Sequence, residues 1–126
     1  MAKILAIDWG TKRVGLAIAD TAARLATPLP SLTAAADLFG QLAQLCVGHE
    51  VKTVVVGLPR GLDGQETAQT KRARRFAAKV GEALKLPVKL QDEALTSALA
   101  RQRKSAEHDL DSQAAAIILT DYLGGE

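Results

Sequence analysis

Residues 3–19 read KILAIDWGTKRVGLAIA, and this stretch decides the fold. Its two apolar runs, Lys3–Ile7 and Val14–Ala19, flank a short glycine-containing segment, which is typical of antiparallel strands joined by a hairpin connection. The following segment, Ala23–Pro30, alternates weakly and carries prolines toward its end, which suits an edge strand. The first 30 residues therefore predict a three-stranded antiparallel meander.

The rest of the chain alternates helical and strand patterns. Val51–Gly57 is almost continuously apolar, which indicates a central strand covered on both faces. A loop is predicted next, at Leu58–Gly64, and a shorter strand is predicted further along the chain, at Pro87–Leu90. Apolar residues at helical spacing predict helices at Ala34–Val47 and Glu66–Leu84. Two further helices are predicted at Thr96–Lys104 and Ser112–Leu123. We expect one α/β domain over residues 1–126, with a mixed sheet in which crossover helices join the meander to parallel strands.

Asp8 ends the first apolar run. A carboxylate in an apolar setting costs several kcal/mol unless a cation or a set of donors meets it. A divalent metal, a phosphate-bound metal, or the nearby Lys12 and Arg13 could meet Asp8. A turn-forming aspartate in the hairpin is the simpler alternative.

Other carboxylates stand at element boundaries. Asp92 and Glu93 follow the last predicted strand, and Asp111 precedes the final helix. If the first and last parallel strands are neighbours, these side chains could meet Asp8 at one edge of the sheet. Oxygen ligands without a histidine or cysteine cluster suit Mg²⁺ or Mn²⁺ and argue against zinc. The alternatives are that Asp111 only caps its helix and that Glu93 is an exposed loop acid.

The composition narrows the setting. The 16 Lys and Arg against 14 Asp and Glu give a net charge of only +2, so charge alone does not establish nucleic-acid binding. The single cysteine, Cys46, cannot form an internal disulfide and is predicted to lie in the core. No apolar run approaches the roughly 18 to 20 residues that span a bilayer. We expect a cytoplasmic protein without a membrane partner.

Positive charge is nevertheless segregated. Five cations occupy the arc of the predicted helix Glu66–Leu84 that faces away from its apolar side: Lys71, Arg72, Arg74, Arg75 and Lys79. The pair Lys12 and Arg13 and the group Arg101, Arg103 and Lys104 could extend this surface toward the acids. Such cations contact phosphates without reading sequence, although a solvated helix face would look the same.

Aromatic residues are scarce. Phe39 and Phe76 fall on apolar helix faces and are predicted core residues, and packing is favoured over base stacking for Trp9. Few stacking platforms favour a duplex or structured nucleic acid over a single strand.

Four blocks stand in order along the chain: Asp8–Ala17, Val56–Pro59 with Asp63 and Gly64, Asp92–Ser97, and Asp111–Leu119. Together they resemble the YqgF family, whose members are described as pre-16S rRNA nucleases or Holliday junction resolvases. The resemblance implies an RNase H-like fold with a five-stranded sheet and a metal site of Asp8, Glu93 and Asp111. It also implies two-ion hydrolysis that leaves a 5′-phosphate and a 3′-hydroxyl.

Two departures from the family pattern concern substrate binding. Ala94 stands where family members usually have arginine, and the approach to Asp111 is altered over residues 101–110. The resemblance favours processing of the 5′ end of pre-16S rRNA, with branched DNA as the alternative substrate. The protein could be a monomer, or a homodimer if it resolves a junction symmetrically.

Two rival functions follow from the same residues. The turn after Asp8 also resembles the phosphate loop of the actin and sugar-kinase superfamily, although those proteins close two such domains over a nucleotide. Alternatively, the chain could be a non-catalytic nucleic-acid-binding module. Retention of all three acids favours catalysis.

Overall fold

A computed structural model describes residues 2–10, 12–61, 63–93 and 110–124. Its strands are β1 (Lys3–Trp9), β2 (Arg13–Asp20), β3 (Thr27–Thr33), β4 (Val51–Pro59) and β5 (Val88–Glu93). They form one sheet in the order β3-β2-β1-β4-β5. The first three strands pair antiparallel, whereas β4 pairs parallel with both β1 and β5. The predicted mixed α/β sheet, a meander plus two parallel strands, is confirmed.

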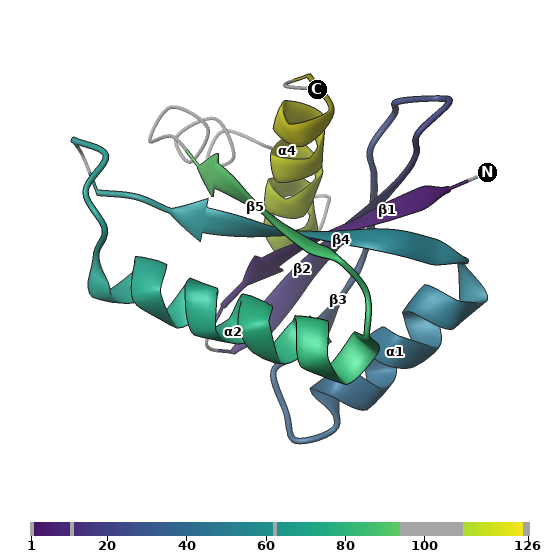
Figure 1. Cartoon of the computed structure of the whole chain (residues 1–126), viewed down its shortest axis with the longest axis horizontal. Coiled ribbons are helices and arrows are strands. Elements are labelled where there is room, and N and C mark those ends of the chain that lie inside the picture. Colours follow the sequence, from purple (N-terminus) through teal and green to yellow (C-terminus); the bar gives the residue numbers. More distant parts are fainter. Residues whose placement is uncertain (1, 11, 62, 94–109, 125–126) are drawn as a thin grey trace.

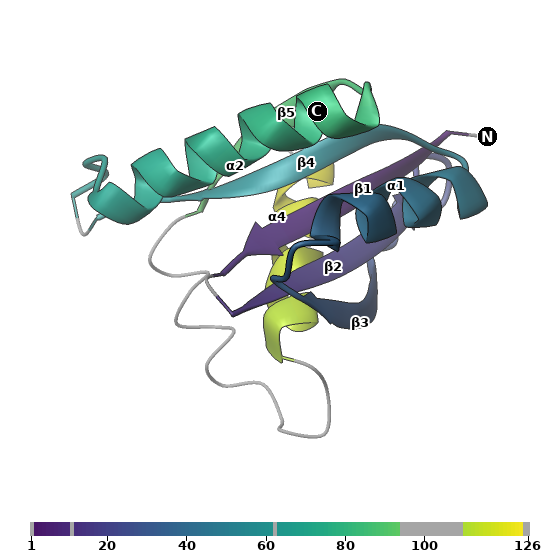
Figure 2. The ribbon, with the colours of Figure 1, turned by 90° about the horizontal axis from the view of Figure 1, so that it is seen from below.

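Helices cover both faces of this sheet (Figures 1 and 2). The helices are α1 (Leu38–Gly48), α2 (Ala68–Leu84) and α4 (Leu110–Gly124). Along β1, Leu5 and Ile7 pack into the core beneath α1 and α2, whereas Ile4 and Ala6 pack into a separate core beneath α4. This alternation follows from the two-residue period of a strand, and it explains why the central strands are apolar throughout.

The observed starts of β3 and α1 differ from the predicted ones. The strand begins at Thr27 instead of Ala23 because the N–H of Arg24 donates to the carbonyl of Asp20 (2.8 Å), which closes a turn there. The helix begins at Leu38 instead of Ala34 because the N–H of Ala34 donates to the carbonyl of Lys12 (2.9 Å) and so continues the contact with β2. The prolines of β3 do lie on an edge strand, as predicted.

The edge of the sheet nearest the predicted site also differs. Strand β4 runs on to Pro59, into the predicted loop, and β5 ends at Glu93 instead of Leu90. Asp92 and Glu93 are polar, so an apolar run does not predict a strand there, but both residues pair with the end of β4. The predicted helix Thr96–Lys104 lies outside the described residues.

The start of α2 is fixed by a capping box. The hydroxyl of Thr67 accepts from the N–H of Thr70, and the N–H of Thr67 donates to the hydroxyl of Thr70 (2.9 Å). Thr70 is buried, and its hydroxyl also donates to the carbonyl of Pro59 at the end of β4. The helix therefore begins at Ala68, and Glu66, which was predicted to be helical, precedes it.

Cys46 lies in the core beneath α1 and α2, as predicted. Burial raises the pKa of its thiol to about 11, because a low-dielectric setting disfavours the thiolate. Among the described residues, no helix is long and apolar enough to cross a bilayer.

Candidate active site at the carboxyl edge of the sheet

Asp8 shares a face of the sheet with the start of α4. It pairs with Gly15 in the register of β1 and β2, and directly opposed residues of antiparallel strands project to the same face. A Cβ atom at Gly15 would lie 1.9 Å from the carbonyl oxygen of Asp111, in the first turn of α4. The absence of a side chain at Gly15 therefore lets α4 approach β2 beside Asp8.

A buried hydrogen bond fixes this approach. The hydroxyl of Ser112 accepts from the N–H of Leu16 at 3.1 Å, and Ser112 is fully buried. The bond joins two residues that are 96 positions apart in the chain. This role of Ser112 was not predicted from the sequence. The one available sign was its position next to Asp111, a predicted site residue, because a hydroxyl that becomes buried there needs a hydrogen-bond partner.

Arg13 forms an ion pair with Asp111. Its Nε atom lies 3.1 Å from the buried Oδ2 atom of the carboxylate, while the Arg13 side chain is 67% exposed. Arg13 precedes Gly15 by two positions on β2, so it projects to the same face. One of the two cations predicted near Asp8 therefore reaches a carboxylate of this edge, that of Asp111, and it remains open to a ligand from solvent.

The main chain of Glu93 ends β5, opposite Pro59. We predicted that carboxylates could meet if the first and last parallel strands were neighbours, and this premise is wrong because β4 lies between β1 and β5. The two strands therefore run about 10 Å apart, twice the usual spacing between strands. Ala94, Arg101, Arg103, Lys104 and Asp109 lie outside the described residues.

Asp92, the neighbour of Glu93, belongs to a chain of ion pairs. Arg60 contacts Asp92 Oδ1 through Nη2 (3.0 Å) and Glu66 Oε2 through Nη1 (3.4 Å), and Arg74 contacts the same Glu66 oxygen (2.6 Å). This charge chain links the segment after β4, the segment before α2 and the end of β5. Sequence reasoning missed Arg60, because nothing local signals a partner 32 residues away.

The charge chain predicts a pH dependence of stability. A hydrogen bond from Arg74, together with the charges of Arg74 and Arg60, lowers the pKa of Glu66 below 4.5. The resulting stabilisation is fully present above the unfolded pKa and is lost as the pH falls through the lower, folded pKa. In Arg74→Gln, the midpoint of urea unfolding should therefore fall less on acidification than in wild type. Lys71→Gln, which removes an exposed cation from the same helix, should retain the wild-type pH dependence.

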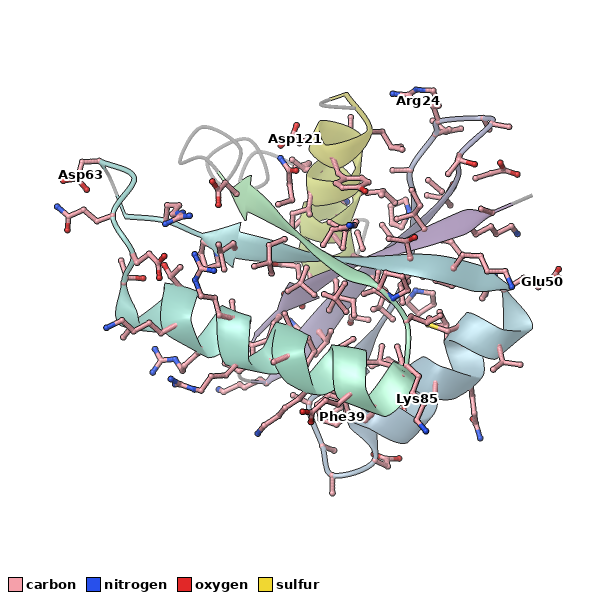
Figure 3. The ribbon with its side chains drawn as sticks, viewed as in Figure 1. Arg24, Phe39, Glu50, Asp63, Lys85 and Asp121 are labelled. Atoms are coloured by element: carbon pink, nitrogen blue, oxygen red, sulfur yellow. The ribbon has the colours of Figure 1, made fainter. Side chains whose placement is uncertain are left out.

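The cations of α2 occupy a different layer from the carboxylates. Lys71, Arg72, Arg75 and Lys79 are exposed, and Figure 3 shows nitrogen-tipped side chains projecting along the outer side of α2. However, α2 packs on the sheet face opposite α4, Asp111 and Asp8. The end of β1, where Trp9 and the exposed Lys12 lie, is where this cationic layer comes near the carboxylate edge, because Trp9 follows Asp8 and lines a groove with Arg72.

Two of the three predicted metal ligands are thus on one face at one edge, and the third ends a strand at the same edge. In the part of the chain that the structure describes, no group of three His, Cys, Asp or Glu side chains is arranged to hold a metal ion. The carboxylates of Asp8 and Asp111 supply only oxygen donors, which is the donor type that Mg²⁺ and Mn²⁺ prefer.

Comparisons with known proteins agree with the predicted family. Residues 2–125 match the family model RuvX, described as Holliday junction resolvase. A protein of Maridesulfovibrio salexigens is 39% identical over 96% of this chain and 97% of its own length. A protein of Bordetella pertussis is 44% identical over 95% of this chain and 92% of its own. Both bear the name "Putative pre-16S rRNA nuclease".

Solved structures show the same fold. Thermus thermophilus RuvC superimposes with a TM-score of 0.60 at 15% sequence identity, covering 98% of this chain and 95% of RuvC. RuvC from T. thermophilus in complex with a Holliday junction substrate gives a TM-score of 0.58 at 13% identity, covering 99% and 95% of the two chains. The RNase H-like fold implied by the sequence is confirmed.

Proposed function

Because the chain belongs to the RuvX (YqgF) family, a family of nucleases, we propose that it is a divalent-metal-dependent nuclease acting on structured nucleic acid. The observation that carries the proposal is the contact of α4 with β2 at Gly15, which brings Asp111 to the face that Asp8 shares. Two carboxylates held by rigid elements at the end of a parallel strand form a suitable base for a catalytic site.

The proposed ligands of the metal are Asp8, Asp111 and Glu93. Two Mg²⁺ or Mn²⁺ ions, when bound, would activate water and stabilise the leaving oxygen of a phosphodiester. Among the residues of this chain, Asp8 would supply the central carboxylate that holds the ions, and Asp111 and Glu93 would supply the further oxygen donors. Arg13 orients the Asp111 carboxylate through their ion pair, and its exposed guanidinium can also donate to a substrate phosphate.

We propose pre-16S rRNA as the substrate, because the relatives named above carry that activity in their names. Processing of its 5′ end is what the family resemblance of the sequence implies. Lys12, Arg13 and the exposed cations of α2, with Arg101, Arg103 and Lys104, would bind the phosphate backbone. A branched DNA junction is the second candidate, favoured by the description of the family. The cytoplasmic location and the choice between monomer and homodimer stay predictions.

A substrate comparison tests this proposal. Purified protein is incubated with Mg²⁺ or Mn²⁺ and with either a precursor of small-subunit rRNA or a four-way DNA junction, and matched linear duplexes serve as controls. We expect cleavage of the rRNA precursor that stops when a chelator removes the metal and leaves a 5′-phosphate.

The other outcomes discriminate among the alternatives. Cleavage of the junction alone, into symmetric products by a dimer, would favour the resolvase. Binding of either substrate without cleavage, under every metal condition, would favour the non-catalytic module and would contradict the proposal. Nucleotide hydrolysis without nuclease activity would favour the alternative that the turn after Asp8 is a phosphate loop like that of the actin and sugar-kinase superfamily.

A further inference from the structure

A groove of about 280 Å³ lies on the face of the sheet opposite Asp111, between α1 and α2. Its floor holds all but one of the chain's aromatic side chains: Trp9, Phe39 and Phe76. The rings of Trp9 and Phe76 have centroids 5.9 Å apart, and those of Phe39 and Phe76 are 5.8 Å apart. Figure 3 shows Phe39 between α2 and the start of α1.

The three aromatic residues are not equally buried. Phe76 is only 6% exposed and belongs to the core, whereas Trp9 and Phe39 are half-buried and line the groove. The sequence predicted packing for all three, and the structure modifies this prediction because it leaves part of two rings facing the groove. An aromatic face on an accessible groove is a platform on which a flat ring can stack.

The rim of the groove is positively charged. Arg72, Arg75 and Lys79 line it, and they lie on the side of α2 that is exposed. No acidic side chain is among the described residues that line the groove. An aromatic floor beneath a purely cationic rim is complementary to a base that is flanked by phosphates, which is how single strands are bound without sequence readout.

The groove opens at the same end of β1 as the candidate active site. Asp8 and Trp9 are consecutive, with Cα atoms about 3.8 Å apart, and a strand projects consecutive side chains to opposite faces. Asp8 therefore belongs to the α4 face and Trp9 to the groove. A nucleic-acid strand that passes around the end of β1 would contact both.

We propose that this groove binds an unpaired nucleotide of the substrate. Its base stacks on Trp9 and Phe39, and its flanking phosphates contact Arg72, Arg75 and Lys79. The inference rests on the proposed nuclease function and specifies it: the substrate presents a single-stranded segment next to the bond that is cut. It adds an unpaired segment to the duplex or structured nucleic acid that the scarcity of aromatic residues favours.

Trp9 provides a direct test, since it is the chain's one tryptophan. Its fluorescence is measured while a short oligouridylate, or an RNA duplex of the same length, is added in the presence of a chelator. Without metal, binding is measured apart from cleavage, so failure of the groove and failure of the nuclease are distinguishable. We expect quenching by the single strand and at least about fivefold weaker binding of the duplex.

Variants separate stacking and charge from folding. Phe39→Leu keeps an apolar side chain but removes the ring, and we expect about fivefold or greater loss of single-strand affinity while the circular dichroism spectrum stays that of wild type. Arg75→Gln should reduce the slope of log K against log salt concentration by about 0.7, the value for one phosphate contact to a single strand. Lys89→Gln, which removes an exposed cation of β5 outside the groove, should change neither quantity to the same extent.

Three results would overturn the inference. The first is a bound oligonucleotide that leaves Trp9 fluorescence unchanged. The second is equal affinity for single strand and duplex in wild type. The third is a concentration-dependent change in fluorescence without nucleic acid, which would show that a second copy of the chain occupies the groove.

Discussion

Replacing Gly15 with alanine is expected to destabilise the protein by about 3 kcal/mol and to lower its melting temperature by on the order of 10 °C. The new methyl group would lie 1.9 Å from the carbonyl oxygen of Asp111, 2.2 Å from its carbonyl carbon and 2.8 Å from the nitrogen of Ser112. All three are backbone atoms, so no side-chain rotation relieves the overlap. Helix α4 must therefore move away from β2.

That movement has a second cost. The hydrogen bond from the N–H of Leu16 to Ser112 joins the same elements, and breaking it leaves buried polar groups unsatisfied. The movement of α4 would also displace Asp111 from the face that it shares with Asp8. The folded fraction of Gly15→Ala should consequently lose nuclease activity as well as stability.

Gly40→Ala is the matched control. Nothing lies within 4 Å of a Cβ atom at Gly40, which is inside α1. Alanine there should stabilise the protein by about 0.5–1 kcal/mol, because alanine loses less conformational entropy in a helix than glycine does. Thermal and urea unfolding followed by circular dichroism measure both variants. Equal stability of Gly15→Ala and wild type would show that α4 does not pack against β2 as described.

The contact at Gly15 also illustrates what the sequence could and could not predict. The hairpin around residues 8–15 was predictable, because two apolar runs and a glycine-containing connection are local signals. The packing of α4 on Gly15 joins residues about 96 positions apart, and no local pattern specifies which helix covers which glycine. Asp111 was selected by its boundary position and by the family pattern, and the structure supplies the physical reason for its placement.

The strand ends were harder to predict than the strand centres. Val54, Val55 and Val56 are fully buried, and their apolar run predicts the centre of β4. Gln91 and Asp92 in β5 are polar, since the strand lies at the edge of the sheet, and only pairing with β4 makes them strand residues. The missed end of β5 is therefore a tertiary effect, and so is the ion pair between Arg60 and Asp92.

The groove was missed for a related reason. The helical period correctly places Phe39 on the inward side of α1. Whether an inward residue is fully covered depends on how far apart α1 and α2 lie, and the helical period of the sequence gives no information about that distance. The structure leaves room between them, so Phe39 and Trp9 are only half-buried.

Replacing Asp8 with asparagine is expected to reduce the rate of nucleic-acid cleavage at least about a hundredfold, which corresponds to about 2.7 kcal/mol at the barrier. Asparagine keeps the shape of the side chain but removes the charge and one acceptor oxygen, which weakens the hold on a divalent cation. Asp8 is half-buried on β1 and opposite Gly15, beside the first turn of α4. Because asparagine is almost the same size as aspartate, the variant should fold, and the lower rate should come from the lost charge and acceptor oxygen.

A thermal readout separates this role from a structural one. Added Mg²⁺ or Mn²⁺ should raise the melting temperature of wild type, because a ligand that binds only the folded state stabilises it by mass action. The shift should be absent or much smaller in Asp8→Asn, whose melting temperature without metal should be close to that of wild type. Glu82→Gln removes an exposed acid near the C-terminal end of α2 and should retain both the shift and the activity. An Asp8→Asn variant that cleaves at the wild-type rate would contradict the proposed site. Loss of activity with an unchanged metal shift would instead assign Asp8 a role other than metal binding.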